Sequence, residues 1–351
     1  MTASHHAFRC TGNGLDGAAG VALTRTSRAL CGACTAAAAA LVLAGVPAAH
    51  AQKFPSKPLR ILVTIGPGSV GDILSRVLAD PLARQMGQPV VVDNRPGAGG
   101  NVAAEIAAKS PADGYTLFLT TISTHGINPS LYGKLAFDPI RDFAPVILLA
   151  TNPNMLVVHP SMPVKNVKDL IALAKKRPGE ITFSSGGSGT SQHMAGEMFA
   201  MSTGTRLIHV PYKSTPASAN AVLAGETMIA FASVPVVIEQ VKAGRLRSLG
   251  VTSGKRMATL PEMPTLAESG VPGFDVSGWF GYSVPAGTPE AIVNQLNGEF
   301  RKAIADPGVR PKLQAQGMDL TESTPGEFAA LIRSEIDRWT KVVRATGAKV
   351  E

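Results

Sequence analysis

Short apolar runs alternate with amphipathic stretches along most of the chain after residue 52. The apolar runs are rich in Val, Ile and Leu and predict short buried strands, while the stretches between them have helical spacing. We expect strands at 59–65, 90–92, 116–121, 145–149, 155–158, 181–184, 206–210, 228–232 and 246–252. We expect helices at 73–85, 103–109, 167–177, 192–202, 217–224 and 236–243. Buried strands that alternate with helices predict an α/β fold of parallel, doubly wound sheets flanked by helices.

The length of the chain predicts more than one domain. About 300 residues follow residue 51, which is more than a single core usually holds. The Pro- and Gly-rich stretch 260–273 is typical of a linker, and helices at 289–305, 307–316 and 325–345 follow it. These late helices need a sheet to cover. We therefore expect a discontinuous domain 1 (52–152 plus 275–351) and a domain 2 (153–274), with a ligand cleft between them and hinge crossovers near Asn152 and Asp275.

The first 51 residues have the order of a secretory signal peptide. Arg25 and Arg28 precede the apolar run 29–46, which is followed by Ala49-His50-Ala51. A basic segment, a short apolar segment and an A-x-A site predict cleavage after Ala51. Residues 1–23 are expected to be an extension upstream of the true translation start. No later apolar run is long enough to span a bilayer. The sequence therefore predicts an exported protein of the periplasm.

The amino-acid composition of the mature chain limits the kinds of molecule that it is expected to bind. All three cysteines lie in the predicted leader, so no thiol chemistry is expected in the mature chain. The mature chain keeps 30 basic and 24 acidic side chains, which are scattered, and the whole chain has only 4 Tyr and 2 Trp. This pattern does not indicate a nucleic-acid surface, and its weak positive field favours small anionic ligands. No cofactor is expected.

The stretch from Gly66 to Asp72 is the first candidate for chemistry. It is a glycine-rich turn between an apolar run and a helical stretch, where backbone N–H groups gather at the positive end of a helix and bind anions. The candidate ligand-binding residues of this turn are Ile65, Gly66, Pro67, Gly68, Ser69, Val70 and Gly71. The turn also fits GxGxxG, and Asp93 stands where a dinucleotide fold places its ribose acceptor. A Rossmann-like nucleotide-binding enzyme is therefore one alternative.

A second turn of the same kind lies in the other half of the chain. The candidate ligand-binding residues there are Ser184, Ser185, Gly189, Thr190 and Ser191. Hydroxyls and free N–H groups suit a carboxylate, and two such turns indicate opposed walls of a cleft. A flexible surface turn is the plainer interpretation. A serine hydrolase is a more specific alternative. However, residues 186–190 match G-x-S-x-G except at the last position, where Thr190 replaces glycine, and neither His193 nor His209 has a recognisable acid partner.

Further candidates follow other strands. Ser123 and His125 lie in a polar stretch that ends a strand, and Tyr212 and Lys213 follow another strand. Each has an ordinary alternative, as a core residue or a solvated surface residue. The mature histidines show no metal-binding spacing, and no metal site is expected. The aromatic cluster at 279–282 is expected to pack in the core or cover the hinge.

Several motifs together resemble the substrate-binding proteins of tripartite tricarboxylate transporters, the Bug family. The resemblance is carried by 54–58 (FPSKP), 66–72, 91–101 (VVDNRPGAGGN), 112–116 (ADGYT), 127–132, 184–193, 210–213, 279–281 and 285–289. It implies a two-domain venus-flytrap fold that acts as a monomer and holds the carboxylate of a small ligand through backbone N–H groups and waters of the two turns. Asp93 then resembles part of the D-N-R-P-G-A-G-G turn rather than a ribose acceptor.

Departures from the family pattern bear on the ligand. Ser69 and Ser214 stand where the family usually has glycine, and the run 227–232 lacks the aspartates that the family often carries there. Ala232 in place of an acid suggests a more apolar ligand end, as in an aromatic or aliphatic acid. The resemblance, together with these departures, implies a non-enzymatic periplasmic receptor that captures a small organic or aromatic carboxylate and delivers it to membrane permease subunits. A receptor that serves ligand sensing is a further alternative.

Overall fold

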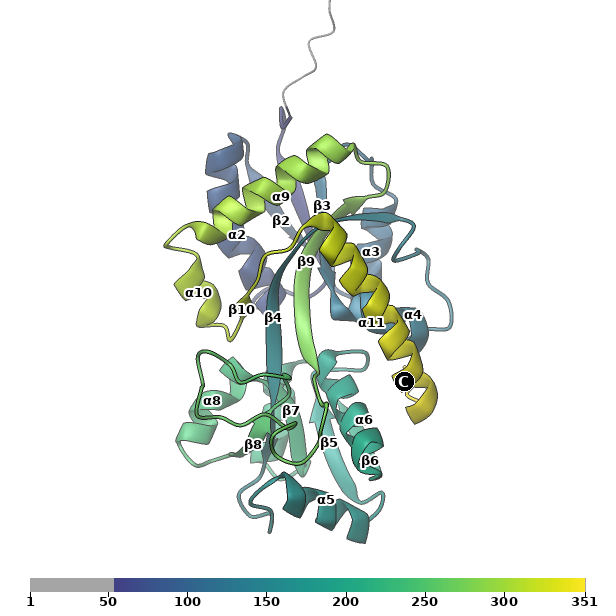
Figure 1. Ribbon diagram of the computed structural model, residues 1–351, viewed down its shortest axis with the longest axis vertical. Helices are drawn as coiled ribbons and strands as arrows, with labels where there is room; N and C mark the ends of the chain where they lie inside the picture. Colours follow the sequence, from purple (N-terminus) through teal and green to yellow (C-terminus); the bar gives the residue numbers. More distant parts are fainter. Residues whose placement is uncertain (1–53, 351) are drawn as a thin grey trace, which may run out of the picture. The chain divides into compact units, whose positions relative to one another are not determined.

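Three parallel strands open the described part of the chain. The computed structural model describes residues 54–350 (Figure 1), so the predicted signal peptide and its cleavage site lie outside it. Strand β1 (Leu59–Val63) pairs with β2 (Val90–Asn94) on one side and β3 (Thr116–Thr121) on the other. Helices α2 (Val70–Met86) and α3 (Asn101–Ala108) make the connections. Both helices lay apolar residues on the sheet, as their spacing predicts.

Two long antiparallel strands run on from this sheet. Strand β4 (Phe143–Val158) pairs with β9 (Ser277–Pro285) from Phe143↔Pro285 to Pro153↔Ser277. Two predictions were wrong here, since 145–149 and 155–158 belong to one strand of 16 residues and β9 was not predicted. The polar residues between the two predicted strands have partners in the fold: Asn152 Nδ2 donates to the Gln316 carbonyl, and the backbone N–H of Asn154 donates to Thr252 Oγ1.

The C-terminal half of β4 joins a second set of strands. Strand β5 (Ile181–Ser185) pairs in parallel with β6 (Leu207–Pro211) and β7 (Ile229–Ser233), while β7 and β8 (Arg247–Val251) pair with β4 in antiparallel fashion. The prediction of parallel sheets was therefore right for β2-β1-β3 and β6-β5-β7 and wrong for the strands around β4 and β9. The flanking helices are α5 (Val167–Lys176), α6 (Ser191–Thr203), α7 (Thr215–Leu223) and α8 (Val234–Lys242).

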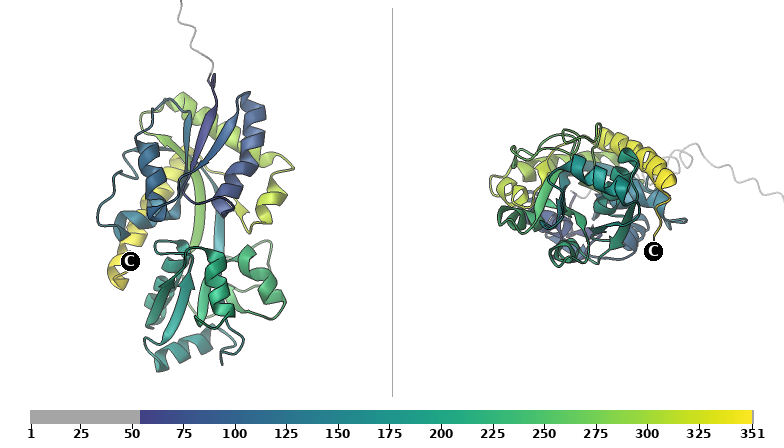
Figure 2. Two further views of the ribbon diagram at one scale, coloured as in Figure 1. Left: turned by 180° about the vertical axis from the view of Figure 1, so that it is seen from behind. Right: turned by 90° about the horizontal axis from the view of Figure 1, so that it is seen from below.

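The last part of the chain returns to the first sheet (Figures 1 and 2). Helix α9 (Glu290–Ala305) packs on α2 and β4, and α10 (Arg310–Gln314) leads to β10 (Asp319–Leu320), which pairs with β4. Helix α11 (Pro325–Thr346) packs on β4, on α6 and on the segment formed by η2 (Ser123–Ile127) and α4 (Asn128–Leu131). The remaining short element is η1 (Ala98–Gly100).

The strands form one hydrogen-bonded path, β2-β1-β3-β9-β4-β7-β5-β6, with helices on its faces. The fold is thus a mixed-sheet α/β fold. The division into two domains at 152 and 275 stays a prediction. No helix within residues 54–350 has the length and apolar character needed to cross a membrane.

Candidate ligand-binding site

Loop 1, residues 65–70, connects β1 to the N-terminus of α2. Ser69 is the N-cap, and its Oγ accepts the N–H of Asp72 at 3.2 Å. In return, Asp72 Oδ2 accepts the N–H of Gly68 at 2.9 Å. The N–H groups of Val70 and Gly71, the first two helical residues, have no carbonyl one turn earlier to bond. Loop 1 therefore presents two backbone donors at the positive end of a helix of 17 residues.

Asp72 anchors loop 1 to strand β2. Its carboxylate also accepts from Arg76 Nε at 3.0 Å and from Asn94 Nδ2 at 2.9 Å, and Asn94 Nδ2 donates in addition to the Ile65 carbonyl. Burial by itself raises the pKa of Asp72, but the hydrogen bonds from Arg76, Gly68 and Asn94 outweigh it, and the pKa lies below its ordinary value. Asp72 is thus an ionised acceptor for loop 1 at neutral pH.

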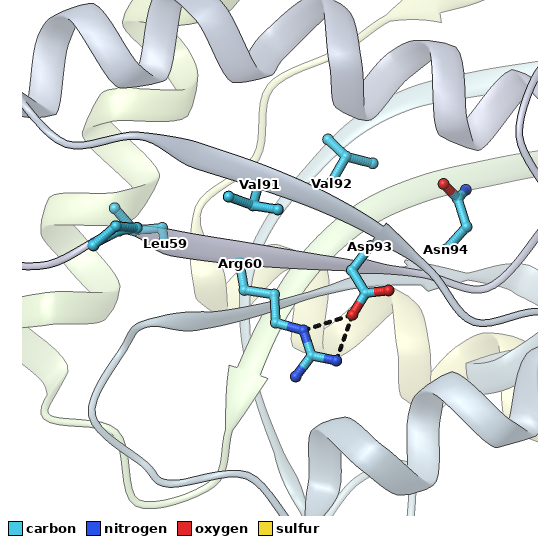
Figure 3. A pocket seen from close by; sticks show the side chains of 7 residues that line it. Leu59, Arg60, Val91, Val92, Asp93 and Asn94 are labelled. Carbon is cyan, nitrogen blue, oxygen red and sulfur yellow. Dashed lines mark hydrogen bonds and ion pairs between the residues drawn. The ribbon is translucent and has the colours of Figure 1, made fainter.

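The neighbouring Asp93 is held by two arginines, of which Figure 3 shows Arg60. Its Oδ2 accepts from Arg60 Nε at 2.8 Å and its Oδ1 from Arg95 Nε at 3.0 Å. Burial raises the pKa of Asp93, but the hydrogen bonds and charges of Arg60 and Arg95 together lower it by more. The pKa of Asp93 therefore lies below its ordinary value. Arg60 and Asp93 line a surface pocket along β1 and β2. Both carboxylate oxygens are therefore engaged in a structural ion pair, which contradicts the interpretation of Asp93 as a ribose acceptor.

Loop 2, residues 184–190, repeats the architecture of loop 1 between β5 and α6. Thr190 is the N-cap, and its Oγ1 accepts the N–H of His193 at 3.3 Å and donates to the Gly187 carbonyl at 2.7 Å. His193 Nδ1 accepts the N–H of Gly189 at 3.2 Å. The N–H groups of Ser191 and Gln192 are the first two of α6 and again have no carbonyl one turn earlier. Both loops thus end in a reciprocally capped helix N-terminus.

Side chains beneath loop 2 fix its course. Gln192 Oε1 accepts the N–H of Gly186 at 2.6 Å, and Gln192 Nε2 donates to Thr215 Oγ1 at 2.8 Å. Ser185 Oγ lies 2.7 Å from His209 Nε2, and the His209 ring stacks on that of His193 with 3.9 Å between centroids. Burial and the neighbouring His193 lower the pKa of His209 to about 3. Because Ser185 is buried and His209 is so weak a base, this pair suits a structural role better than nucleophilic catalysis.

A third glycine turn lies beside loop 2. Gly97, Ala98, Gly99 and Gly100 all have positive φ and lead into α3. Asn128 Nδ2 donates to the Gly99 carbonyl at 3.1 Å and to Asn101 Oδ1 at 2.7 Å, while Asn128 Oδ1 faces Gly189 of loop 2. Sequence reasoning missed Asn128 as a site residue. Its only signal was its place in the 127–132 family motif.

Two polar atoms near this turn lack hydrogen-bond partners among the described residues. Thr64 Oγ1 at the end of β1 and Asn128 Oδ1 are both buried. A Cβ placed on Gly100 would lie 2.9 Å from Thr64 Cβ, and one placed on Gly99 would lie 3.5 Å from Asn128 Oδ1. Buried polar atoms without partners are rare in folded proteins and are typical of sites that a ligand or an ordered water completes. Thr64, which directly precedes loop 1, and Asn128, which faces loop 2, therefore both lie against the third glycine turn.

The predicted site residues differ in exposure. Ile65, Pro67, Gly68 and Lys213 are exposed; Gly66, Ser69, Val70, Ser123, Thr190, Ser191 and Tyr212 are partly exposed; Gly71, His125, Ser184, Ser185, Gly189 and Ala232 are buried. Ser191 Oγ accepts from Asn154 Nδ2 at 3.2 Å, which links loop 2 to β4. Ser184 Oγ donates to the Ser218 carbonyl at 3.0 Å beneath the loop.

Some of the predicted residues belong to neither loop 1 nor loop 2. Ser123 lies in η2, and Tyr212 lies beside loop 2, where its backbone N–H donates to the Ser185 carbonyl at 3.0 Å. His125 is fully buried with its ring 4.6 Å from that of Phe143, and burial lowers its pKa to about 3, which favours a packing role. The Tyr212 hydroxyl donates to Glu226 at 3.1 Å rather than toward loop 2, and Lys213 is exposed. Ala232 belongs to an apolar cluster with Met155 and Val251. No group of three or more His, Cys, Asp or Glu within residues 54–350 could hold a metal ion.

Solved structures of periplasmic proteins, among them the periplasmic binding protein BugD, share this α/β fold with a mixed sheet flanked by helices. The model of the family described as "Tripartite tricarboxylate transporter family receptor" matches residues 74–348. The chain therefore belongs to this family of solute-binding receptors, and the resemblance predicted from its motifs is confirmed.

Individual relatives are similar over nearly their whole length. Protein BugT of Bordetella pertussis is 36% identical over 313 residues, which cover 89% of this chain and 96% of BugT. The solved structure of R. palustris Rpa4515 with adipate is 35% identical with a TM-score of 0.77, covering 85% of this chain and all of the other. MatC from Rhodopseudomonas palustris with bound malate is 28% identical with a TM-score of 0.74, covering 83% of this chain and all of MatC.

Proposed function

We propose that this protein is a periplasmic receptor that captures a small carboxylate between loop 1 and loop 2 and delivers it to membrane permease subunits of a tripartite tricarboxylate transporter. The observation that carries the proposal is the pair of reciprocally capped helices, because each cap occupies the N–H groups around it and leaves those of Val70 and Gly71, or of Ser191 and Gln192, for an anion. Relatives solved with adipate and with malate support a carboxylate as that anion.

The energy available from these donors is sufficient for binding without covalent chemistry. Micromolar affinity needs about 8 kcal/mol. Charge-assisted hydrogen bonds contribute about 1.5–3 kcal/mol each and a helix N-terminus about 0.3–1 kcal/mol. Four N–H groups on two helices together supply about 7–14 kcal/mol, which brackets this requirement. The upper part of that range also covers the ordering that binding costs. Binding, closure and release therefore require neither a cofactor nor catalysis. In this proposal the receptor acts as a monomer.

Closure follows from the two-domain division. The segments 52–152 plus 275–351 and 153–274 move about the crossovers near Asn152 and Asp275. Asn152 of β4 pairs with Gly278 of β9, and Asp275 lies just before the start of β9. The end of the ligand away from the carboxylate contacts side chains rather than backbone. Since Ala232 offers no acid and sits in an apolar cluster, an aromatic or aliphatic acid is favoured over a hydroxylated one.

A thermal-shift and calorimetric screen tests the binding half of the proposal. N-terminal sequencing of the secreted protein should show that the mature chain begins at Gln52. This mature chain is titrated with adipate, malate and benzoate, and with adipamide as an uncharged control. At least one carboxylate should stabilise the protein, and adipamide should not. A folded protein that no carboxylate stabilises contradicts the proposal. Much tighter binding of malate than of adipate and benzoate contradicts only the apolar-end assignment.

Uptake measurements test delivery. Deletion of the gene should abolish uptake of the identified acid, and complementation should restore it. Unchanged uptake by the deletion strain, with binding intact in vitro, would contradict delivery to a permease and leave the receptor to serve sensing.

A further inference from the structure

The N-termini of α2 and α6 both contact strand β9. A Cβ built on Gly278 would lie 3.3 Å from Oγ of Ser191, the first residue of α6. A Cβ built on Gly71, in the first turn of α2, would lie 3.5 Å from Cε1 of Phe280. Gly278 and Phe280 are two residues apart, so they face the same side of the strand at positions roughly 7 Å apart. The helix N-termini that follow loop 1 and loop 2 therefore converge on one face of β9.

Strand β4 holds the N-terminus of α6 on this face. Asn152 of β4 pairs with Gly278 of β9. Asn154, two residues further along β4, donates from Nδ2 to Ser191 Oγ at 3.2 Å. The Ser191 hydroxyl accepts this bond and keeps its own proton available for an anion. Together with the N–H groups of Ser191 and Gln192, α6 thus presents three donors beside β9.

Phe280 supplies an apolar surface next to these donors. Its ring packs on the apolar cluster that includes Leu74 of α2, and the residue remains partly exposed. Tyr282, the next residue on the same face, is fully buried, and Gly278 in the other direction has no side chain. Of these three residues, Phe280 therefore offers the accessible apolar surface. The carbon atoms that adjoin a carboxylate bound at the Gly71 N–H would lie beside its ring.

Resting on the proposed function, we propose that Gly278 and Phe280 of β9 form the floor of the carboxylate site and that the Phe280 ring packs against the carbon atoms next to the carboxylate. This floor selects acids in which those carbon atoms are apolar, as they are in adipate and benzoate. A hydroxyl group at that position would lose its water and gain no hydrogen-bond partner from the ring. The selection acts at the carboxylate end of the ligand and does not depend on Ala232.

Calorimetry with matched variants and matched ligands tests this proposal. Adipate and benzoate are titrated into wild type, Phe280→Leu and Phe54→Leu. Phe280→Leu should raise the Kd of the acid about two- to tenfold, the value of about one methylene group in contact with the ring. Phe54 is also partly buried on the same cluster, but it stacks on Tyr115 before the start of β1, so Phe54→Leu should keep the wild-type Kd. Wild type should bind 2,5-dihydroxyadipate, which has a hydroxyl next to each carboxylate, at least about fivefold more weakly than adipate.

The outcomes separate the two proposals. An unchanged Kd in folded Phe280→Leu overturns the role of Phe280, as does an equal rise of Kd in Phe54→Leu. Binding of 2,5-dihydroxyadipate as tight as that of adipate overturns the selection. No binding of any carboxylate by wild type contradicts the proposed function instead. A measurement without substitution covers a variant that does not fold: the ring protons of Phe280 in wild type should show nuclear Overhauser effects to the carbon-bound protons of the bound acid. Their absence in the saturated complex overturns the proposal.

Discussion

Gly189 of loop 2 lies directly against Asn128. A Cβ built on Gly189 would come within 3.1 Å of Asn128 Oδ1 and of Leu131 Cδ2. The same glycine has a φ of +77° and gives its N–H to His193. Because Gly189 has no side chain, it can adopt a left-handed backbone, donate its N–H at the start of α6 and lie close to the segment that carries Asn128.

Replacement of Gly189 is expected to affect both stability and binding. The Gly189→Ala substitution should cost about 1–2 kcal/mol for the left-handed backbone and about 1–3 kcal/mol for crowding against Asn128 and Leu131. Because crowding displaces loop 2, the Kd for the carboxylate should rise roughly tenfold. Urea denaturation and calorimetry measure the two effects.

Gly179 provides the matched control for that experiment. Its φ is +75°, and a Cβ there would meet no atom within 4 Å. Gly179→Ala should therefore show the backbone cost alone and leave the Kd unchanged. Equal losses of stability and equal affinities for the two variants would contradict the importance of the contact with Asn128.

The N-terminus of α2 depends on Gly71 in a different way. A Cβ on Gly71 would lie 2.6 Å from Leu119 Cδ2, so Gly71→Ala should push the helix from the sheet, cost about 1–3 kcal/mol and weaken binding. Gly66→Ala in the same loop meets nothing within 4 Å, and its stability should change by less than about 0.5 kcal/mol. Thermal unfolding and calorimetry compare the pair. A benign Gly71→Ala would argue against tight packing at this helix start.

Asp72 is expected to stabilise the protein in a pH-dependent manner. Because its folded-state pKa is lowered, its contribution is present at neutral pH and is lost as the pH falls through that value. Asp72→Asn should therefore cost about 1–3 kcal/mol at pH 7, and the difference from wild type should shrink below about pH 4. Urea denaturation at both pH values measures this.

The Asp169→Asn variant is a matched control for Asp72→Asn. Asp169 is also the third residue of its helix and accepts the N–H of Lys165 at 2.9 Å, but it is partly exposed whereas Asp72 is buried. Asp169→Asn should lose less stability than Asp72→Asn and leave carboxylate affinity unchanged. If both variants bound the ligand like wild type, the capping carboxylate of loop 1 would have no part in binding.

Glu335 connects both tryptophans of the chain. Its Oε2 accepts from Trp279 Nε1 at 3.1 Å and from Trp339 Nε1 at 2.9 Å in a buried position. Glu335→Gln should lower the free energy of unfolding by about 1.5–3 kcal/mol, because bonds to a charged acceptor are lost. Since the chain has only these 2 Trp, the change should also appear in tryptophan emission. Glu239→Gln, which alters an exposed pair with Lys242, should leave both unchanged.

Periodicity identified most elements because it reports local burial. The strand predicted at 116–121 was found at exactly those residues, and both glycine turns lead from a strand into a helix. Strand β9 escaped because Gly278 and Gly281 interrupt its apolar pattern, and Gly281 has no side chain for a reason of packing: a Cβ there would lie 2.4 Å from Phe328 Cζ. Polar residues at 152–154 concealed the continuity of β4 because their partners, Gln316 and Thr252, are distant in sequence.

The sequence by itself determined the α/β class, the family and the two glycine-rich turns, since each is expressed in neighbouring residues. Tertiary structure alone decided the antiparallel course of β4 and β9, the burial of His125, and the approach of Asn128 to Gly189. It also decided that Asp72 and His193 have equivalent roles. The physical reason is that hydrogen-bond partners and low-dielectric surroundings come from distant segments, and no local pattern records which segments meet.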